Sequence, residues 1–374
     1  MFDYDKHYLN SKLFQDFVNK VESNIDTDDK YIFFSVEPSL PELHEICKKN
    51  NFEKPIYIIS FSESHQYCHL LHTFIREIPI EVKNYNIYLL GTFAKSSKIT
   101  YKENTLNLCS LKHSPFSTFC MLPTFTELLK VDFVEKQHLL SCLMFGKTII
   151  RDYIWTKLAE NNLIEYTTYH SYVKNGKKLG FKQFTDYSDM LDTYEDNFKQ
   201  MEDNFKTIFD ENYFNSYYKF QNYLPKTIDV ETETIRENNY FNETLEVLNK
   251  SLFNLVTETT LGWNIIDSNR FIPMAPMTEK CLFPFLTYNI PLILHDDNHI
   301  IKKHFQNIGL DMFDDIIPEE FYTKKYFYEK LEVVINFLNS YNKVDNNFKE
   351  RLIHNEKVAR NSFVPYQDIN EFIK

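Results

Sequence analysis

The stretch from residue 252 to residue 294 carries the side chains best suited to chemistry, because each follows or precedes a short apolar segment. The run Leu252–Val256 ends at Thr257 and Glu258, and a polar stretch with Arg270 comes next. Pro276 and Thr278-Glu279-Lys280 then open an expected helix, and Pro291-Leu-Ile-Leu294 forms a second apolar run. In an α/β sheet, ligands bind beyond the carboxyl ends of strands and at helix N-termini.

These residue types predict recognition of a nucleoside diphosphate. Lys280 and a helix N-terminus favour the charge of a pyrophosphate, and the guanidinium of Arg270 offers forked donors to phosphate oxygens. Glu258 and Glu279 are suited to accept hydrogen bonds from ribose hydroxyls. The alternative reading of Thr278-Glu279-Lys280 is a capped surface helix with a solvated Glu-Lys pair.

The order of these segments resembles the donor-binding domain of glycosyltransferases with two Rossmann-like domains, the GT-B fold. The nearest likenesses are the α-1,3-fucosyltransferase and exostosin groups and similar enzymes of large viruses and phages. Those families carry a T/S-E-K helix followed by an apolar strand that starts with proline, which matches Thr278-Glu279-Lys280 and Pro291–Leu294. The resemblance covers about 60 residues, and glycine before the proline strand is replaced here by Tyr288-Asn289-Ile290.

The resemblance also implies roles for residues in the first half of the chain. Glu37, in Ser35-Val-Glu-Pro-Ser39, resembles the Glu-Ser-Pro element of fucosyltransferases and is the first candidate for the base that deprotonates the acceptor hydroxyl. Glu63 follows the next expected strand and is the second candidate. Lys147 and Arg151 match a basic loop and a helix-opening arginine of the related transferases, so they are expected to bind the donor; surface charge is their alternative reading.

No metal ion is expected to be required. Metal-dependent transferases hold a divalent ion with Asp-x-Asp after a strand, whereas Asp26-Thr-Asp28 precedes its expected strand and Asp296-Asp297 lacks the spacing. His65, His69 and His72 share one face of an expected helix, but three ligands on a single helix rarely complete a zinc tetrahedron. Structural or acceptor-lining histidines are the favoured reading there.

Composition limits the class of partner and compartment. The formal net charge is −12 and no basic stripe occurs, which argues against a nucleic-acid partner. No dinucleotide or P-loop glycine motif is found among only 6 glycines. The 6 cysteines form no CxxC pair and are expected to be reduced thiols. No segment has the length of a membrane span or the pattern of a signal peptide, so a soluble cytoplasmic protein is expected.

Apolar runs alternate with helical patterns, which predicts an α/β fold with parallel sheets. Strands are expected at 31–36, 55–61, 86–90, 139–144, 252–256 and 291–294, and residues 1–30 are expected to be helical. Together with the resemblance, this predicts two Rossmann-like domains facing across a cleft, with an added helical segment. The expected units are an acceptor domain (1–160), a helical insertion or linker (161–239), a donor domain (240–345) and a helix returning to the first domain (346–374).

The expected function is therefore an inverting, metal-independent transfer of a sugar from a GDP- or UDP-linked donor to a hydroxyl acceptor, with no other cofactor. Inversion follows from the resemblance alone. A non-catalytic interaction protein that retains a GT-B-like fold is the alternative, with the acidic, aromatic segment 187–225 as its working surface. Nucleotide binding discriminates the two readings, because a scaffold has no need to aim Arg270 and Lys280 at one cleft.

Overall fold

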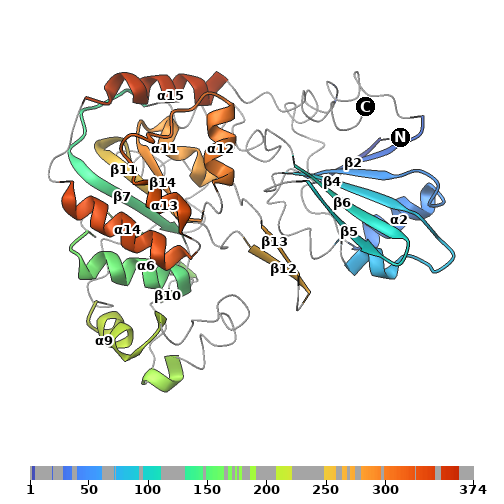
Figure 1. Cartoon of the computed structure of the whole chain (residues 1–374), viewed down its shortest axis with the longest axis horizontal. Helices are drawn as coiled ribbons and strands as arrows, with labels where there is room; N and C mark the ends of the chain where they lie inside the picture. Colours follow the sequence, from blue (N-terminus) through green and yellow to red (C-terminus); the bar gives the residue numbers. More distant parts are fainter. Residues whose placement is uncertain are drawn as a thin grey trace.

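The structure is a computed structural model, and most of its described strands belong to two separate, mainly parallel sheets (Figure 1). It describes residues 2–4, 19, 28–35, 40–60, 71, 73–91, 96–110, 131–145, 149–163, 167–170, 173–174, 177–178, 186–190, 208–220, 248–257, 263–267, 270–273, 279–295, 299–324, 326–341 and 347–361. Among these residues, no helix is long and apolar enough to cross a membrane.

The first sheet contains six strands in the order β1-β2-β3-β4-β6-β5. Neighbouring strands are parallel except for β5 and β6, which form an antiparallel pair. The strands are β1 (Phe2–Tyr4), β2 (Tyr31–Ser35), β3 (Ile56–Ser60), β4 (Asn86–Gly91), β5 (Ser97–Tyr101) and β6 (Asn104–Ser110). The helix expected over residues 1–30 is wrong at its start, because Phe2–Tyr4 pair with β2 instead.

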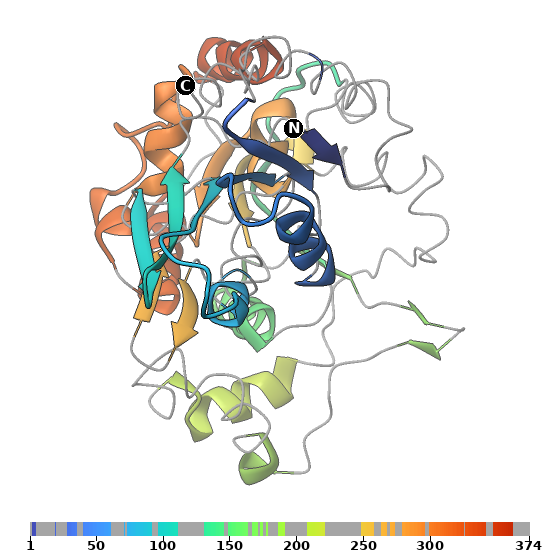
Figure 2. The same ribbon diagram turned by 90° about the vertical axis from the view of Figure 1, so that its right-hand side faces the viewer.

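The core of this first sheet lies on one face. Helix α2 (Leu40–Lys49) and the helical residues 73–77 lie against this face (Figure 2). Their buried side chains share one core with Ile58 and Leu89. From β1 to β4 the chain always moves to the next strand in the same direction. Right-handed crossovers then place the connecting helices on the same side of the sheet, as observed.

The second sheet contains four parallel strands in the order β14-β11-β7-β8. They are β7 (His138–Phe145), β8 (Thr167–His170), β11 (Ser251–Val256) and β14 (Ile290–Ile293). The expected unit 1–160 would place β7 beside the first sheet, but β7 pairs with β11. An apolar run buried on both faces does not reveal its partner, since pairing occurs through the backbone. The division into domains stays a prediction, although β7 belongs with strands from the second half.

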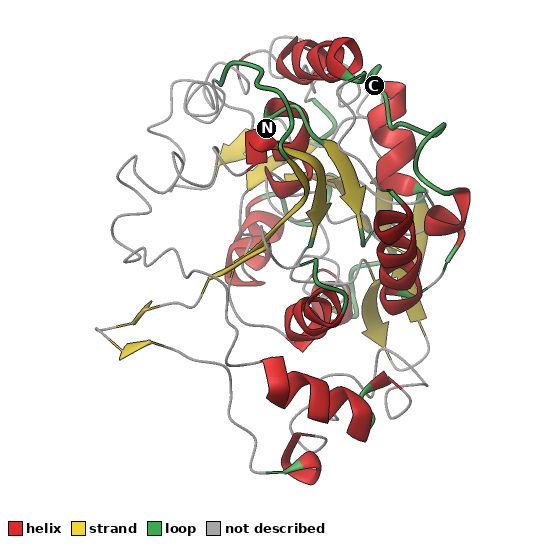
Figure 3. Ribbon diagram, turned by 90° about the vertical axis from the view of Figure 1, so that its left-hand side faces the viewer, coloured by secondary structure: helices red, strands yellow, loops and turns green. Residues whose placement is uncertain are grey.

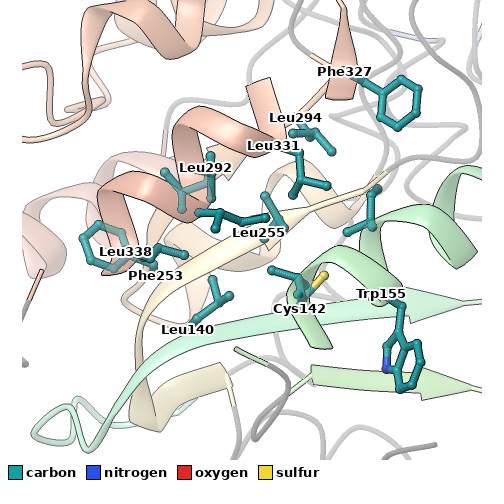
Figure 4. Packing of buried hydrophobic residues seen from close by; sticks show 14 of the residues in the cluster. Leu140, Cys142, Trp155, Phe253, Leu255, Leu292, Leu294, Phe327, Leu331 and Leu338 are labelled. Atoms are coloured by element: carbon teal, nitrogen blue, oxygen red, sulfur yellow. The ribbon is translucent and has the colours of Figure 1, made fainter. Parts of the chain in front are cut away.

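Helices cover both faces of the four-stranded sheet (Figure 3). Helices α6 (Ile149–Glu160) and α14 (Phe327–Ser340) pack on one face, where Leu331 and Leu338 meet Phe253 and Leu255 (Figure 4). Helices α11 (Phe283–Leu286) and α12 (Ile300–Asn307) belong to the core of the other face. The sheet is therefore wound in two directions: the crossover through α6 and the one through α11 run opposite ways and lie on opposite faces.

The C-terminal helix α15 (Lys349–Asn361) also belongs to this second unit. Arg351 bonds Asp311 and Asp315, Asn355 accepts from the Asp311 amide, and Ala359 joins the core of α11 and α12. The described part of the segment 346–374 therefore does not return to the first sheet. Residues 362–374 lie outside the described residues.

The intervening segments contain further differences from expectation. Helix α9 (Glu211–Phe220) packs on α6 through Tyr213 and Tyr217, which is part of the helical segment expected over 187–225. Strands β9 (Val173–Lys174) and β10 (Lys177–Lys178) form a short antiparallel pair. A second antiparallel pair, β12 (Trp263–Asp267) and β13 (Arg270–Pro273), replaces the polar loop expected around Arg270.

Candidate functional site at the carboxyl edge of the four-stranded sheet

The candidate site is the point where the winding of the four-stranded sheet reverses. Strands β7 and β11 are neighbours, but the helices that follow them lie on opposite faces. The chain therefore leaves the two strands toward opposite faces, and in open α/β sheets ligands bind in the crevice that forms at such a point. The same reversal is absent between β1 and β4, whose order is sequential. The second sheet is thus the better candidate for a ligand site.

Arg151 spans this reversal point. It lies in the first turn of α6, directly after β7, and its Nη2 atom donates to the carbonyl of Thr257 at the end of β11 over 3.5 Å. The residue is 2% exposed, so its charge acts in a poorly solvated environment. Burial raises the pKa of the neighbouring Cys142 thiol to about 12, and the Arg151 charge opposes this rise.

The hydroxyl of Thr257 is a buried polar group at the same point. Thr257 Oγ1 makes no hydrogen bond to any residue that the structure describes, although Thr257 is 2% exposed. Buried hydroxyls in native proteins are almost always hydrogen-bonded, and the exceptions often mark functional positions. Arg151 and Thr257 together offer a cation and a hydroxyl to a ligand.

The other predicted donor-binding residues are described only in part. Lys147, Glu258 and Thr278 lie outside the described residues. Of Arg270 and Glu279 only the backbone is described: Arg270 opens β13 opposite Asp267, and Glu279 opens the 3-10 turn η3 (Glu279–Cys281). The structure brings Arg151 to the reversal point and leaves the places of the other side chains open.

The helix expected at Thr278-Glu279-Lys280 is shorter than the pattern indicated. Glu279–Cys281 form a 3-10 turn, and α11 contains only four residues. So short a helix has little macrodipole, and the positive charge of this segment belongs to the half-buried Lys280. Cys281 Sγ lies 3.6 Å from Nε2 of His295, the second residue after β14. This contact fastens the turn to the carboxyl edge.

Two further buried cations occur close to this edge, and sequence reasoning missed both. Lys302 lies in the first turn of α12 and is 7% exposed, and Lys330 lies in the first turn of α14 and is 2% exposed. Rings of Tyr153 and Phe327, 5.6 Å apart, place the first turns of α6 and α14 side by side. The first turns of α6, α12 and α14 each contain a buried cation, although the helix dipole favours anions there.

A cationic cluster surrounds the β14 end of this edge and consists of His299, Lys302, Lys330 and Tyr322. The His299 ring stacks on Tyr322 of α13 (Glu319–Thr323) at 5.4 Å, and Lys302 Nζ lies 3.9 Å from the centroid of the Tyr322 ring. Lys302 also pairs with Asp314 at 2.8 Å. Burial lowers the pKa of His299, and the charges of Lys302, Lys303 and Lys330 lower it further against the opposing effect of Glu319.

The two candidate bases lie outside the described residues, but the strands before them do not. Ser35 and Ser60, the last residues of β2 and β3, are paired neighbours in the first sheet. Glu37 and Glu63 follow these two strand ends in the sequence, two and three residues later. Their roles remain predictions.

Within the described part of the chain, no group of three or more His, Cys, Asp or Glu side chains could hold a metal ion. His65, His69, His72 and Asp296-Asp297 lie outside that part, so the expectation of metal independence remains a prediction.

Comparison with known proteins assigns no family to the chain. No protein-family model matches it, and neither the curated proteins nor the solved structures contain a significant match.

Proposed function

We propose that the chain is a glycosyltransferase that moves a sugar from a nucleoside-diphosphate donor to a hydroxyl acceptor. The observation that carries this proposal is the meeting of Arg151 and Thr257 across the reversal point of a doubly wound sheet. Nucleotides bind at such points in many α/β proteins. The likeness of residues 252–294 to the donor domains of GT-B enzymes supports the choice of a sugar nucleotide.

In the proposed reaction, the acceptor oxygen attacks the anomeric carbon while the bond from that carbon to the diphosphate oxygen breaks. The acceptor proton passes to a carboxylate, with Glu37 as the first candidate and Glu63 as the second. Negative charge develops on the departing diphosphate. Arg151 and Lys280, with Lys147 and Arg270 as further candidates, would stabilise that charge without a metal ion.

Ligand-dependent melting tests this proposal. The purified protein is heated with GDP, UDP, ADP or CDP, each with chelator and with manganese. A ligand at a hundred times its dissociation constant adds about 2.7 kcal/mol to the free energy of unfolding, which is a measurable shift. We expect one nucleotide to shift the melting temperature in chelator. A shift that requires manganese contradicts metal independence, and no shift with any nucleotide favours the non-catalytic alternative.

Donor hydrolysis then separates an enzyme from a nucleotide-binding scaffold. Many transferases slowly hydrolyse their donor, and the nucleotide found in the melting test names the sugar nucleotides to try. We expect slow release of that nucleoside diphosphate, and Glu37→Gln is expected to lower turnover while sparing donor affinity. An unchanged rate in the Glu37→Gln variant would remove this residue from the mechanism.

A further inference from the structure

The side chain of Thr257 lies where the packing of the sheet favours an apolar residue. Thr257 follows the last residue of β11, and the pairing with the β14 segment extends to this point, since the Leu294 amide donates to the Val256 carbonyl over 3.2 Å. Side chains alternate along a strand, so Thr257 lies on the same face as Phe253 and Leu255. These two residues and Leu294 belong to one hydrophobic core. Valine has nearly the shape of threonine and would suit these neighbours.

The hydroxyl of Thr257 is therefore unfavourable for the fold. Within the described part of the chain, the buried Oγ1 atom has no hydrogen-bond partner. A hydroxyl that leaves water without gaining a new partner lowers the free energy of unfolding. Other buried threonines use their hydroxyls inside the fold. Thr287 Oγ1 donates to the Phe283 carbonyl at 2.6 Å, and Thr156 Oγ1 likewise donates to a backbone carbonyl at 2.8 Å.

We infer that the Thr257 hydroxyl binds a phosphate oxygen of the ligand, and that the fold is less stable because this contact is reserved for the ligand. Thr257 is the first residue beyond β11, so a ligand at the carboxyl edge of the sheet meets it at the strand end. Nη2 of Arg151 lies 3.5 Å from the carbonyl of the same residue. A guanidinium only donates hydrogen bonds, and an oxygen without a proton, such as that of a phosphate, can accept from both groups. The choice of a diphosphate rests on the proposed function, whereas the unpaired hydroxyl does not.

Two substitutions at this position separate stability from binding. Thr257→Val removes the hydroxyl and keeps the shape, whereas Thr257→Ser keeps the hydroxyl and removes the methyl group. Thermal melting of the proteins without ligand measures the first effect. We expect Thr257→Val to melt about 2 °C above the original protein, because a buried unpaired hydroxyl is lost. Thr257→Ser should melt below it, because a buried methyl group is lost.

Calorimetric titration in chelator measures the second effect, with pyrophosphate and with GDP, UDP, ADP and CDP as probes. We expect Thr257→Val to bind pyrophosphate and the preferred nucleotide about tenfold more weakly or worse, since a hydrogen bond to a charged group is lost. Thr257→Ser should keep an affinity close to that of the original protein. The more stable variant is thus the one that binds less, which a purely structural threonine would not produce.

Thr287→Val is the matched control. Thr287 is 0% exposed and precedes β14, so it lies at the opposite edge of the same sheet, and its hydroxyl is paired. The same chemical exchange should therefore lower the melting temperature there and leave ligand affinity unchanged.

A Thr257→Val protein that melts at or below the original would show that the hydroxyl is satisfied within the fold, and this overturns the inference. Unchanged affinity in that variant overturns it as well. Pyrophosphate binding that depends on the hydroxyl, without nucleotide binding, would keep the phosphate contact and refute the sugar-nucleotide donor. Nucleotide binding that is indifferent to the hydroxyl would keep the transferase and refute the contact. Absence of binding by every probe would refute both.

Discussion

Lys136 is a buried ammonium group at the amino edge of the four-stranded sheet, opposite the candidate site. It donates to the carbonyls of Asn249 at 2.6 Å and Thr287 at 3.4 Å, and so joins the segments that lead into β7, β11 and β14. Burial lowers the pKa of Lys136 to about 7. Between pH 7 and the ordinary lysine pKa, the unfolded chain therefore holds a proton that the folded protein lacks. The free energy of unfolding must rise with pH over this window.

The variant Lys136→Met tests this dependence. We compare the free energy of unfolding of the original protein with that of the variant. We expect this difference to rise by about 2 kcal/mol in favour of the original protein between pH 7 and pH 9, at about 1.4 kcal/mol per pH unit. Urea denaturation at both pH values measures the difference. The control Lys98→Met removes an exposed lysine from β5 and should shift both values equally. A difference between Lys136→Met and the original protein that does not change with pH would show that Lys136 stays charged in the fold.

Arg151 is the residue on which the proposed donor site most depends. Lysine keeps the charge but lacks the fork that reaches the Thr257 carbonyl and a phosphate oxygen together. Loss of one charge-assisted hydrogen bond costs about 1.5–3 kcal/mol, so Arg151→Lys should weaken nucleotide affinity roughly tenfold to a hundredfold. Calorimetry measures this change. Arg76→Lys, an exposed exchange of the same kind, should bind normally; equal affinity in both variants would exclude Arg151 from the site.

At the scale of elements, α15 depends on one arginine for its attachment. Arg351 donates to Asp311 and Asp315 and lies over the Phe313 ring at 4.4 Å. The Arg351 guanidinium holds the pKa of the Asp315 carboxyl below its ordinary value. This stabilisation is present above the ordinary aspartate pKa and is lost as pH falls through the lowered one. Its size is modest, because the network is partly solvated.

The variant Arg351→Met should therefore lower the free energy of unfolding by about 1 kcal/mol. The loss is expected at neutral pH and low salt, and it should shrink in concentrated salt and at pH 3. Urea denaturation under these conditions measures it. Lys357→Met, an exposed change on the same helix, is the control. A loss that persists unchanged at pH 3 would assign the effect to lost packing on Phe313.

Local patterns predicted several elements well. The six expected strands are confirmed by β2, β3, β4, β7, β11 and β14, because an apolar run bounded by polar residues is a property of the segment itself. The partner of β7 was not predictable, since it depends on backbone pairing with residues more than 100 positions away. The β12–β13 pairing and the short length of α11 likewise depend on tertiary contacts, which a local sequence pattern does not contain.

The residues near the candidate site likewise include one that the sequence predicted and others that it did not. Arg151 was predicted because a strand, a short basic loop and a helix-opening arginine follow one another here as in the resembling transferases, and this order is visible in a sequence. Lys302 and Lys330 were missed because their sequence positions are those of ordinary helix-surface cations. Their burial depends on the packing of α13 and α14, since Tyr322 of α13 contacts Lys302. The available sequence signal was a lysine within the first turn of an apolar helix.

At the scale of the whole molecule, each sheet has its own hydrophobic core. One cluster of buried side chains belongs to the six-stranded sheet and α2, and separate clusters occupy the two faces of the four-stranded sheet. The mixed α/β character with parallel sheets is confirmed, while two GT-B domains facing across a cleft remain a proposal. The two sheets also differ in winding: the parallel strands of the six-stranded sheet follow one another in sequence order, whereas the four-stranded sheet reverses direction between β7 and β11.

This difference in winding predicts where a nucleotide will protect the chain from hydrogen exchange. Mass spectrometry with the nucleotide found in the melting test should show slower exchange in peptides that contain Arg151, Thr257, Lys280 and His299. Peptides around Lys136, at the opposite edge of the same sheet, should change little, since the ligand contacts only the carboxyl edge. Protection of the Lys136 peptides as strong as that at Arg151 would indicate global stabilisation. Protection confined to the six-stranded sheet would move the donor site away from the reversal point, because bound nucleotide would then lie against strands wound in a single direction.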